Sequence, residues 1–388
     1  MHTLHGLLCA TFALAACNPA KAGSTIDYSV TSGRTSNVFK DPTNLSSPFV
    51  EGKLVLRGTL AREETQLTYG LAASIKRIAR YRFADERRVG IEAGYTQELG
   101  EAVKFTLKGG IERRQDGDIF LALPDLMIGY RKADIFSTGS AGVTVDHGGG
   151  KSHLTATLSN LNRGKAEFTL EGLPRTQLEA GNRLAEFTGG HIRPLLGGEI
   201  GATLQYRTNH IPRDEQEDFE RFPARTLRGS LAYGRAFDNG ITLMAEAGMV
   251  RIASKELSQT VDPTRPFLKT ELAIQLPRDT VLKAKLSRDI ELADIDDPLG
   301  EDVRTAGISI ETALTEKLKL GLAFEQAYSD WLYYDYRTRT TSTTATLSYT
   351  LAKGATVALE YSHLVRRETD ETADFKVDGL AARFSGSF

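Results

Sequence analysis

Apolar and polar residues alternate along most of the chain, and this period of two constrains the fold more than any other feature of the sequence. Counting back by twos from the last residue gives Phe388, Gly386, Phe384, Ala382 and Leu380, and the residues between them are mostly polar or small. Successive side chains of a β-strand point to opposite faces, so this ending predicts a strand with one apolar face. An outward apolar face with a terminal aromatic residue is typical of the closing strand of a membrane barrel.

The same alternation recurs from Gly23 onward, with little helical periodicity. It is clear over residues 67–75, 200–206 and 241–249, and the Asn239-Gly240 pair between two such runs is a strong hairpin signal. Residues 126–130 and 166–170 also alternate and are predicted as strands, whereas residues 176–196 show no clean apolar face. The tally is about 18 strands, within a range of 16 to 20.

The connections between the strands alternate in length. Those near 238–240, 277–279, 315–317 and 352–354 are tight, whereas those near 209–224, 253–265 and 291–301 are long and charged. Bacterial outer-membrane barrels combine short periplasmic turns with long extracellular loops. The prediction is therefore an all-β fold, a transmembrane antiparallel up-and-down β-barrel over residues 23–388, with both ends of the barrel on the periplasmic side.

Composition is compatible with this fold and excludes several others. The chain is 40% hydrophobic and 25% charged, and beyond residue 17 no apolar run approaches the length of a transmembrane helix. A soluble sandwich, propeller or solenoid is the main competitor, but it would show continuous apolar strands or a fixed-length repeat, and neither is found. The net charge of −2 argues against a nucleic-acid partner.

The first 22 residues are predicted to be a signal peptide, because residues 4–16 are apolar, short and followed by small residues. Two cleavage points compete. One lies after Ala22, and the other lies before Cys17, where Leu14-Ala15-Ala16-Cys17 resembles a lipobox and Cys17 would be acylated. Both cysteines lie in this segment, so no disulfide and no cysteine-based metal site is expected.

The residues that alternate with the apolar set should face the lumen, and in the first strands many of them are basic. They form a predicted basic wall that consists of Lys53, Arg57, Lys76, Arg80, Arg82, Arg88, Lys104 and Lys108. Stripes of Lys and Arg bias a pore toward anions. The alternative is that cross-strand pairs with interspersed acids such as Glu51, Glu92 and Glu112 neutralise the wall.

Catalytic and cofactor sites are not predicted. Ser152 and His153 are adjacent, so on a strand they point to opposite faces, and His210 lies beside a charged loop. The acids Asp294, Asp296 and Asp297 suit a hard cation such as Ca²⁺ in composition, but a run of charges in a loop is usually solvated. No separate domain of 100 or more residues precedes the first strand, which disfavours a plugged receptor.

The signal peptide, the alternating strands and the ending from Leu380 to Phe388 resemble an outer-membrane β-barrel protein of Gram-negative bacteria. The ending, with Phe384 and Phe388, is similar to the C-terminal signal that the barrel-assembly machinery reads. The resemblance implies the cell outer membrane as location and its lipid and lipopolysaccharide as partners.

The segment 28–42, with Asn37-Val38-Phe39, is also similar to the opening of a porin-like family linked to exopolysaccharide export. That resemblance implies a channel for anionic small solutes or for an exported acidic polysaccharide. The alternatives are a non-conducting structural or adhesin-like barrel and, less favoured, a barrel enzyme.

Overall fold

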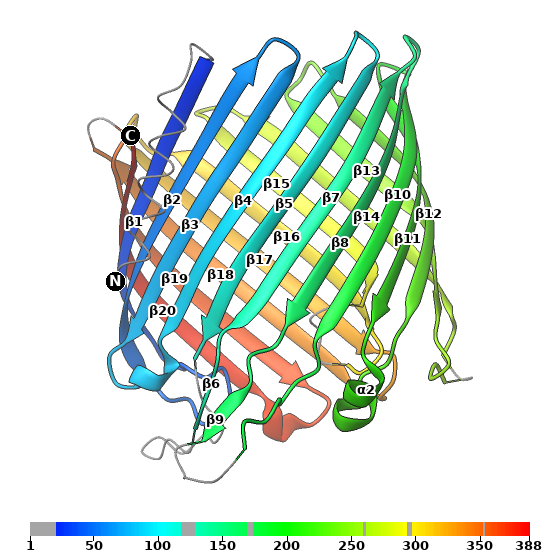
Figure 1. Ribbon diagram of the computed structural model, residues 1–388. Helices are drawn as coiled ribbons and strands as arrows, with labels where there is room; N and C mark the ends of the chain where they lie inside the picture. The colour runs from blue at the N-terminus through cyan, green and yellow to red at the C-terminus, as the bar shows by residue number, and fades with distance from the viewer. Residues whose placement is uncertain (1–20, 118–128, 169–173, 259–260, 293–296, 352–353) are drawn as a thin grey trace.

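One closed barrel of 18 antiparallel strands dominates the computed structural model, which describes residues 21–117, 129–168, 174–258, 261–292, 297–351 and 354–388 (Figure 1). Each barrel strand pairs with the next barrel strand along the chain, and the last strand pairs with the first. The predicted fold class and strand number are confirmed.

The strands of the first half of the barrel are β1 (Lys21–Thr35), β2 (Ser47–Arg62), β3 (Thr65–Ile78), β4 (Glu86–Leu99), β5 (Val103–Asp116), β7 (Asp134–Asp146), β8 (Lys151–Asn162) and β10 (Asn182–Leu195). Those of the second half are β11 (Gly198–His210), β12 (Arg225–Ala236), β13 (Ile241–Ala253), β14 (Thr264–Leu276), β15 (Thr280–Glu291), β16 (Glu301–Ala313), β17 (Leu318–Trp331), β18 (Arg337–Thr350), β19 (Thr356–Glu368) and β20 (Phe375–Ser387). The short elements outside the barrel wall are β6 (Gly129–Arg131), β9 (Ala166–Phe168), α2 (Arg213–Phe219), η1 (Arg82–Ala84) and η2 (Glu371–Ala373).

Tight turns gather at one end of the barrel and long loops at the other, at the top and bottom of Figure 1 respectively. We call these the periplasmic and extracellular ends, after the loop pattern of bacterial barrels. β1 starts and β20 ends at the periplasmic end, as predicted. β1 begins at Lys21, two residues before the predicted mature terminus, and the remainder of the predicted signal peptide lies outside the described residues.

The closing strand keeps its pairing to the last residue. The Phe388 amide donates to the Ile26 carbonyl at 3.1 Å, and the Ile26 amide donates to the Phe388 carbonyl at 2.9 Å. The Phe388 ring stacks on Tyr28, with 5.0 Å between the ring centroids. Phe384 and Phe388 are exposed on the outer face, and their role as an assembly signal stays a prediction.

The two faces of the wall differ as the alternation predicted. Apolar side chains such as Leu54, Leu154, Leu204 and Leu231 are exposed on the outer face, where they form the surface for lipid. The charged residues that alternate with this apolar set, such as Lys53 and Glu92, face the lumen. Among the described residues, no helix has the length and hydrophobicity to cross a membrane.

Two of the predicted strands are wrong as barrel strands. The alternating segments around Tyr130 and Ala166 contribute only β6 and β9, which pair with each other in a separate two-stranded sheet at the extracellular end (Figure 1). Three residues rise only about 10 Å, too little to cross a hydrophobic band of about 25 Å. Residues 126, 128 and 169–170 of those predicted runs lie outside the part of the chain that the structure describes.

The segment 182–195, for which no clean face was found, is the full strand β10. Its pattern is weak because its outer face carries Arg183, Gly189 and His191 and its inner face carries Gly190 and Ile192. Pairing with β8 and β11 along its whole length makes it a strand.

Candidate functional site: the lumen and its extracellular mouth

The predicted basic wall separates into two groups. Lys53 and Arg57 lie on β2, Lys76 on β3, Arg88 on β4, and Lys104 and Lys108 on β5, all with the register that faces the lumen. Arg80 and Arg82 are instead in the extracellular connection between β3 and β4, with Arg82 in η1. The Arg80 amide donates to Ser47 Oγ at 3.0 Å.

Acidic side chains on neighbouring strands compensate part of this wall. Arg57 pairs with Asp27 at 2.8 Å and Lys76 with Glu86 at 2.7 Å. Lys104 lies 3.8 Å from Glu98 near the periplasmic end. Lys53 and Lys108, which are both exposed to the lumen, make no hydrogen bond or ion pair with any residue in the described part of the chain.

Both unpaired lysines line a hollow of about 740 Å³ on the inner face of β2, β3, β4, β5 and β7. The other charged side chains that line it are Arg57, Glu92 and Glu112, and Glu112 is bound by Arg114 at 2.9 Å. Phe136 provides an aromatic surface at the same site. The hollow therefore combines two free ammonium groups with the single free carboxylate of Glu92 among its described charged residues.

Glycines create the space for this hollow. Gly70, Gly90, Gly94 and Gly110 all have the register that faces the lumen, on three adjacent strands. An added Cβ at Gly70 would lie 2.6 Å from Glu92 Oε1, and one at Gly94 would lie 2.6 Å from Thr68 Oγ1, so a larger residue at either position would displace those side chains. Glycines at alternate positions were the signal in the sequence that could have located the hollow.

The opposite wall contains inner-face lysines with partners. Lys285 binds Glu325, Lys269 lies 3.6 Å from Glu271, and Lys319 lies 3.6 Å from Glu311. Further toward the C-terminus, Arg383 binds Glu360 at 3.0 Å. Lys283 of β15 has the same inner-face register and no partner among the described residues. Unpaired lysines therefore occur on both walls, and Lys53 and Lys108 are the two that line the glycine-rich hollow.

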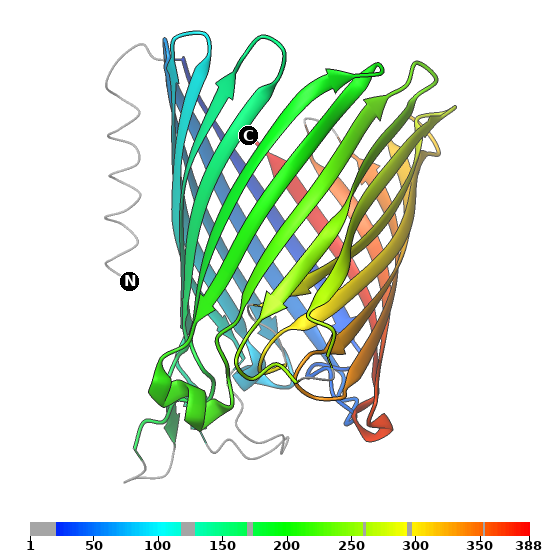
Figure 2. The ribbon, with the colours of Figure 1, turned by 90° about the vertical axis from the view of Figure 1, so that its right-hand side faces the viewer.

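The extracellular end of β15 turns inward across the mouth of the barrel. Arg207 of β11 binds Asp289 of β15 at 3.0 Å and donates to the Ile290 carbonyl at 2.7 Å, and Arg228 of β12 binds the other Asp289 oxygen at 3.2 Å. Strands β11 and β12 are not neighbours of β15 in the wall, so the end of β15 must bend toward them. Beyond Arg288 it is no longer paired with β14, but it stays paired with β16 as far as Glu291. Figure 2 shows the yellow and orange loops crossing the lower end of the barrel.

A small apolar core fills the space under this crossing. Val250, Ile252, Phe267, Ile290, Leu292, Leu299 and Leu332 are all nearly inaccessible to solvent and form one cluster. Phe267 also carries the Arg228 guanidinium over its ring at 4.0 Å. Burial of apolar surface thus holds the loops on one side of the mouth.

Asp297 organises the loop that caps this core, residues 297–300. Its side chain is fully buried, and Oδ1 accepts from the Leu299 and Gly300 amides at 2.8 and 2.9 Å. Oδ2 accepts from the Tyr333 and Tyr334 amides at 3.1 and 3.3 Å. The expectation of a solvated acid was therefore wrong for Asp297, because it satisfies four backbone donors. Asp294 and Asp296 lie outside the described residues.

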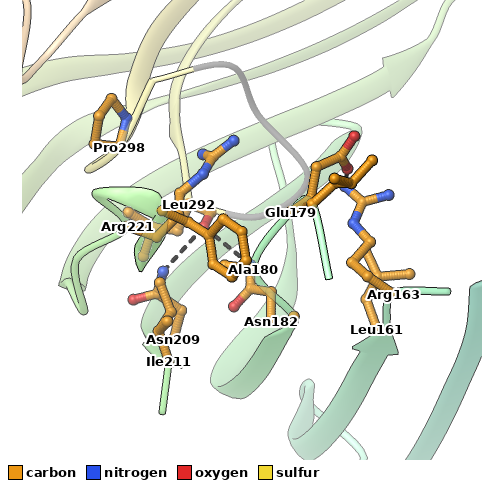
Figure 3. Close-up of a pocket in the computed structure, with 13 residues that line it drawn as sticks. Leu161, Arg163, Glu179, Ala180, Asn182, Asn209, Ile211, Arg221, Leu292 and Pro298 are labelled. Carbon is orange, nitrogen blue, oxygen red and sulfur yellow. Dashed lines mark hydrogen bonds and ion pairs between the residues drawn. The ribbon is translucent and has the colours of Figure 1, made fainter. Parts of the chain in front are cut away.

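A pocket of about 170 Å³ lies beside this cap (Figure 3). In it, Asn182 and Asn209 both donate to the Leu292 carbonyl, at 3.4 and 3.2 Å, and Figure 3 marks these bonds. Arg221 donates to the Asp297 carbonyl at 2.6 Å. These bonds fasten the loop after β15 to the ends of β10 and β11.

Side chains near the mouth also tie separate loops together. Tyr334 donates to Glu220 at 2.6 Å, and this bond to a carboxylate raises the pKa of Tyr334 to about 12. The pKa of Tyr336 is also raised to about 12, because its ring is partly desolvated and its hydroxyl binds Glu368. Both phenols remain protonated donors over the whole physiological range.

Ser152 and His153 do point to opposite faces, but Ser152 has two other histidine neighbours. His147 Nε2 and His191 Nδ1 lie 2.9 and 3.0 Å from Ser152 Oγ, near the periplasmic end. The sequence did not indicate this cluster because His191 reaches Ser152 only through the pairing of β8 with β10. In the described part of the chain, no group of three or more His, Cys, Asp or Glu residues is placed to bind a metal.

Comparison with solved structures shows a fold shared with siderophore receptors. The siderophore receptor PirA from Acinetobacter baumannii has a TM-score of 0.52 at 8% identity, over 96% of this chain and 81% of PirA. A mutant of the ferric enterobactin receptor PfeA from Pseudomonas aeruginosa has a TM-score of 0.52 at 9% identity, with the same coverage. FpvA of P. aeruginosa, bound to heterologous pyoverdines, has a TM-score of 0.51 at 10% identity, over 94% of this chain and 72% of FpvA.

No family model matches the sequence, and no curated protein sequence matches it. The closed 18-stranded barrel and its likeness to these receptors place the chain among outer-membrane β-barrels, so the predicted location in the outer membrane is confirmed. The comparisons do not support the resemblance to a porin-like family linked to exopolysaccharide export.

Proposed function

We propose that this protein is an outer-membrane channel that passes small anionic solutes along the hollow of the β2–β7 wall. The observation that carries the proposal is the pair Lys53 and Lys108, which face an open, glycine-lined space without partners among the described residues. The fold shared with the siderophore receptor PirA and the ferric enterobactin receptor PfeA also supports a role in solute transport.

Charge in this position acts on passing ions. An unpaired ammonium group attracts an anion, whereas an ammonium that already binds a carboxylate has little net field. Conduction also needs weak binding, and two flexible lysines in contact with water attract an anion without enclosing it. An acidic oligosaccharide is also negatively charged, so the same lysines would attract it.

Reversal potentials in planar bilayers under a salt gradient test the proposal. We expect the wild-type barrel to prefer chloride over potassium and K53Q/K108Q to lose that preference. The matched control is K269Q/K285Q, which removes the same charge from lysines that have glutamate partners. It should shift selectivity less.

Two results would contradict the proposal. A wild-type channel without anion preference would show that the wall does not select ions. A well-folded barrel without conductance would instead favour the structural or adhesin-like alternative.

For a conducting barrel, adding an acidic oligosaccharide to one side of the bilayer tests whether it is the cargo. A transported chain should block the chloride current in a concentration-dependent way.

A further inference from the structure

The outer surface of the barrel carries arginines at its extracellular end. Each lies within three residues of the extracellular end of its strand and is exposed, and six of them form what we call the arginine belt: Arg87, Arg113, Arg183, Arg225, Arg251 and Arg367. They come from β4, β5, β10, β12, β13 and β19, so five of the six lie on the arc from β4 to β13 and one lies on β19.

Strand register places these side chains on the lipid side. Arg87 is opposite Ile75, Arg113 is opposite Val89, and Arg251 is opposite Leu227. Ile75, Val89 and Leu227 are themselves exposed apolar residues of the outer face. The belt therefore lies where the apolar outer surface ends and the extracellular loops begin.

The belt arginines lack anionic partners within the described part of the protein. None of the six makes a side-chain hydrogen bond or an ion pair there. Arg367 is even directly opposite Arg339 on β18, a like-charge pair that destabilises a sheet unless an anion lies between the two. By contrast, Arg304 and Arg337, on β16 and β18, both bind Asp330.

The periplasmic end lacks such a belt. In the described strands, the outward Lys and Arg residues within three positions of that end are Arg62, Arg193 and Arg235. Of these, Arg235 donates to the Leu196 carbonyl at 3.0 Å and lies over the Phe237 ring. Arg62 and Arg193 have no side-chain partner among the described residues. Two uncompensated outward arginines at this end therefore compare with six at the extracellular end.

This asymmetry identifies the partner. Arginine binds phosphate through two parallel N–H donors, and a cation at a membrane boundary needs such a counter-charge. If phospholipid headgroups were the partner, both ends of the barrel would need a belt. We propose that the arginine belt binds the phosphate groups of a phosphorylated glycolipid in the outward leaflet, the chemistry of lipopolysaccharide.

Native mass spectrometry of the full chain, folded in a neutral detergent, tests this by titration with lipid A that carries both phosphates. The wild-type barrel should bind it more tightly than lipid A with its phosphates removed. R113Q or R183Q should each weaken binding by about fivefold, the effect of roughly one interfacial charge. Substituting all six belt arginines by glutamine should weaken it far more.

The triple variant R62Q/R193Q/R235Q is the matched control, because it removes outward arginines from the other end. It should leave the affinity unchanged, and heat-modifiable migration should show that every variant is folded. If the variant with all six belt arginines replaced does not fold, the affinities of R113Q and R183Q for lipid A test the proposal.

Three outcomes would overturn the proposal. The first is equal binding of lipid A with and without phosphates, or by folded belt variants. The second is equally tight binding of phosphatidylglycerol with the same loss in the belt variants, which would make the surface a general anionic-lipid site. The third is saturation of the belt by inorganic phosphate at the concentrations at which lipid A binds.

Discussion

The two sides of the lumen use the same kinds of residue for different purposes. On the β2–β7 wall, the inner-face lysines Lys53 and Lys108 face an open hollow and have no described partner. On the β11–β17 side, the inner-face arginines Arg207 and Arg228 bind Asp289, which the chain itself supplies by folding inward. An inner-face cation can therefore stay accessible in the lumen or hold the cap, and the difference lies in whether an acid of the same chain reaches it.

Removing the buried carboxylate of Asp297 should loosen the cap on the β11–β17 side of the lumen, so that this side becomes open like the β2–β7 wall. D297N leaves the Tyr333 and Tyr334 amides facing an amide group, and each unsatisfied buried donor costs about 1–3 kcal/mol. We expect faster hydrogen exchange at Leu299, Gly300, Tyr333 and Tyr334, and a larger single-channel conductance.

D335N is the control for this substitution, because Asp335 is an exposed acid in the same region. Unchanged exchange and conductance in D297N would show that the apolar cluster alone holds the cap.

Filling the hollow should make the open side resemble the capped one. At Gly90 an added Cβ would meet Glu112 at an ordinary distance of 3.5 Å, so G90F is compatible with the wall. A phenyl group needs roughly 150 Å³, about a fifth of the hollow. We expect a clear fall in conductance with normal folding.

G52F tests the same substitution on the lipid side, where Gly52 has no atom within 4 Å of an added Cβ. Equal conductance of G90F and G52F would mean that the hollow is not on the conducting path.

The smallest effect concerns the tie between two mouth loops, Tyr334 to Glu220. A raised pKa means that the folded state prefers the neutral phenol, so this stabilisation is complete below about pH 10 and is lost as the pH rises through about 12. Titration followed by tyrosinate absorbance should show Tyr334 and Tyr336 titrating near pH 12. Y334F should remove one of these two contributions, and E220Q should move that contribution to lower pH. A midpoint that E220Q does not change would exclude this carboxylate as the cause.

Alternation predicted the barrel well because it is a local property. Each strand has one apolar and one polar face, and residues 241–249 needed no distant partner to be recognised. The prediction failed where this contrast is weak. In β10, glycine, histidine and isoleucine mix the faces, whereas in β9 a clean alternation over three residues was too short to cross the membrane.

The candidate site was predictable only in part. Parity placed Lys53, Arg57, Lys76, Arg88, Lys104 and Lys108 on the inner face, as the register shows. It did not show which of them lack partners, because Arg57 meets Asp27 only after β1 and β2 pair. Arg80 and Arg82 followed the same parity but lie beyond the end of β3.

The sequence by itself determined a two-faced sheet, the approximate number of strands and, where the alternation is clear, which side chains point toward lipid, since these follow from the period of two and the turns. Only the tertiary structure decided where the lumen is open. The cap depends on contacts between residues far apart in the chain, such as Asp297 with Tyr333 and Arg207 with Asp289. Such contacts form only when the closed barrel brings those segments together, so no local pattern encodes them.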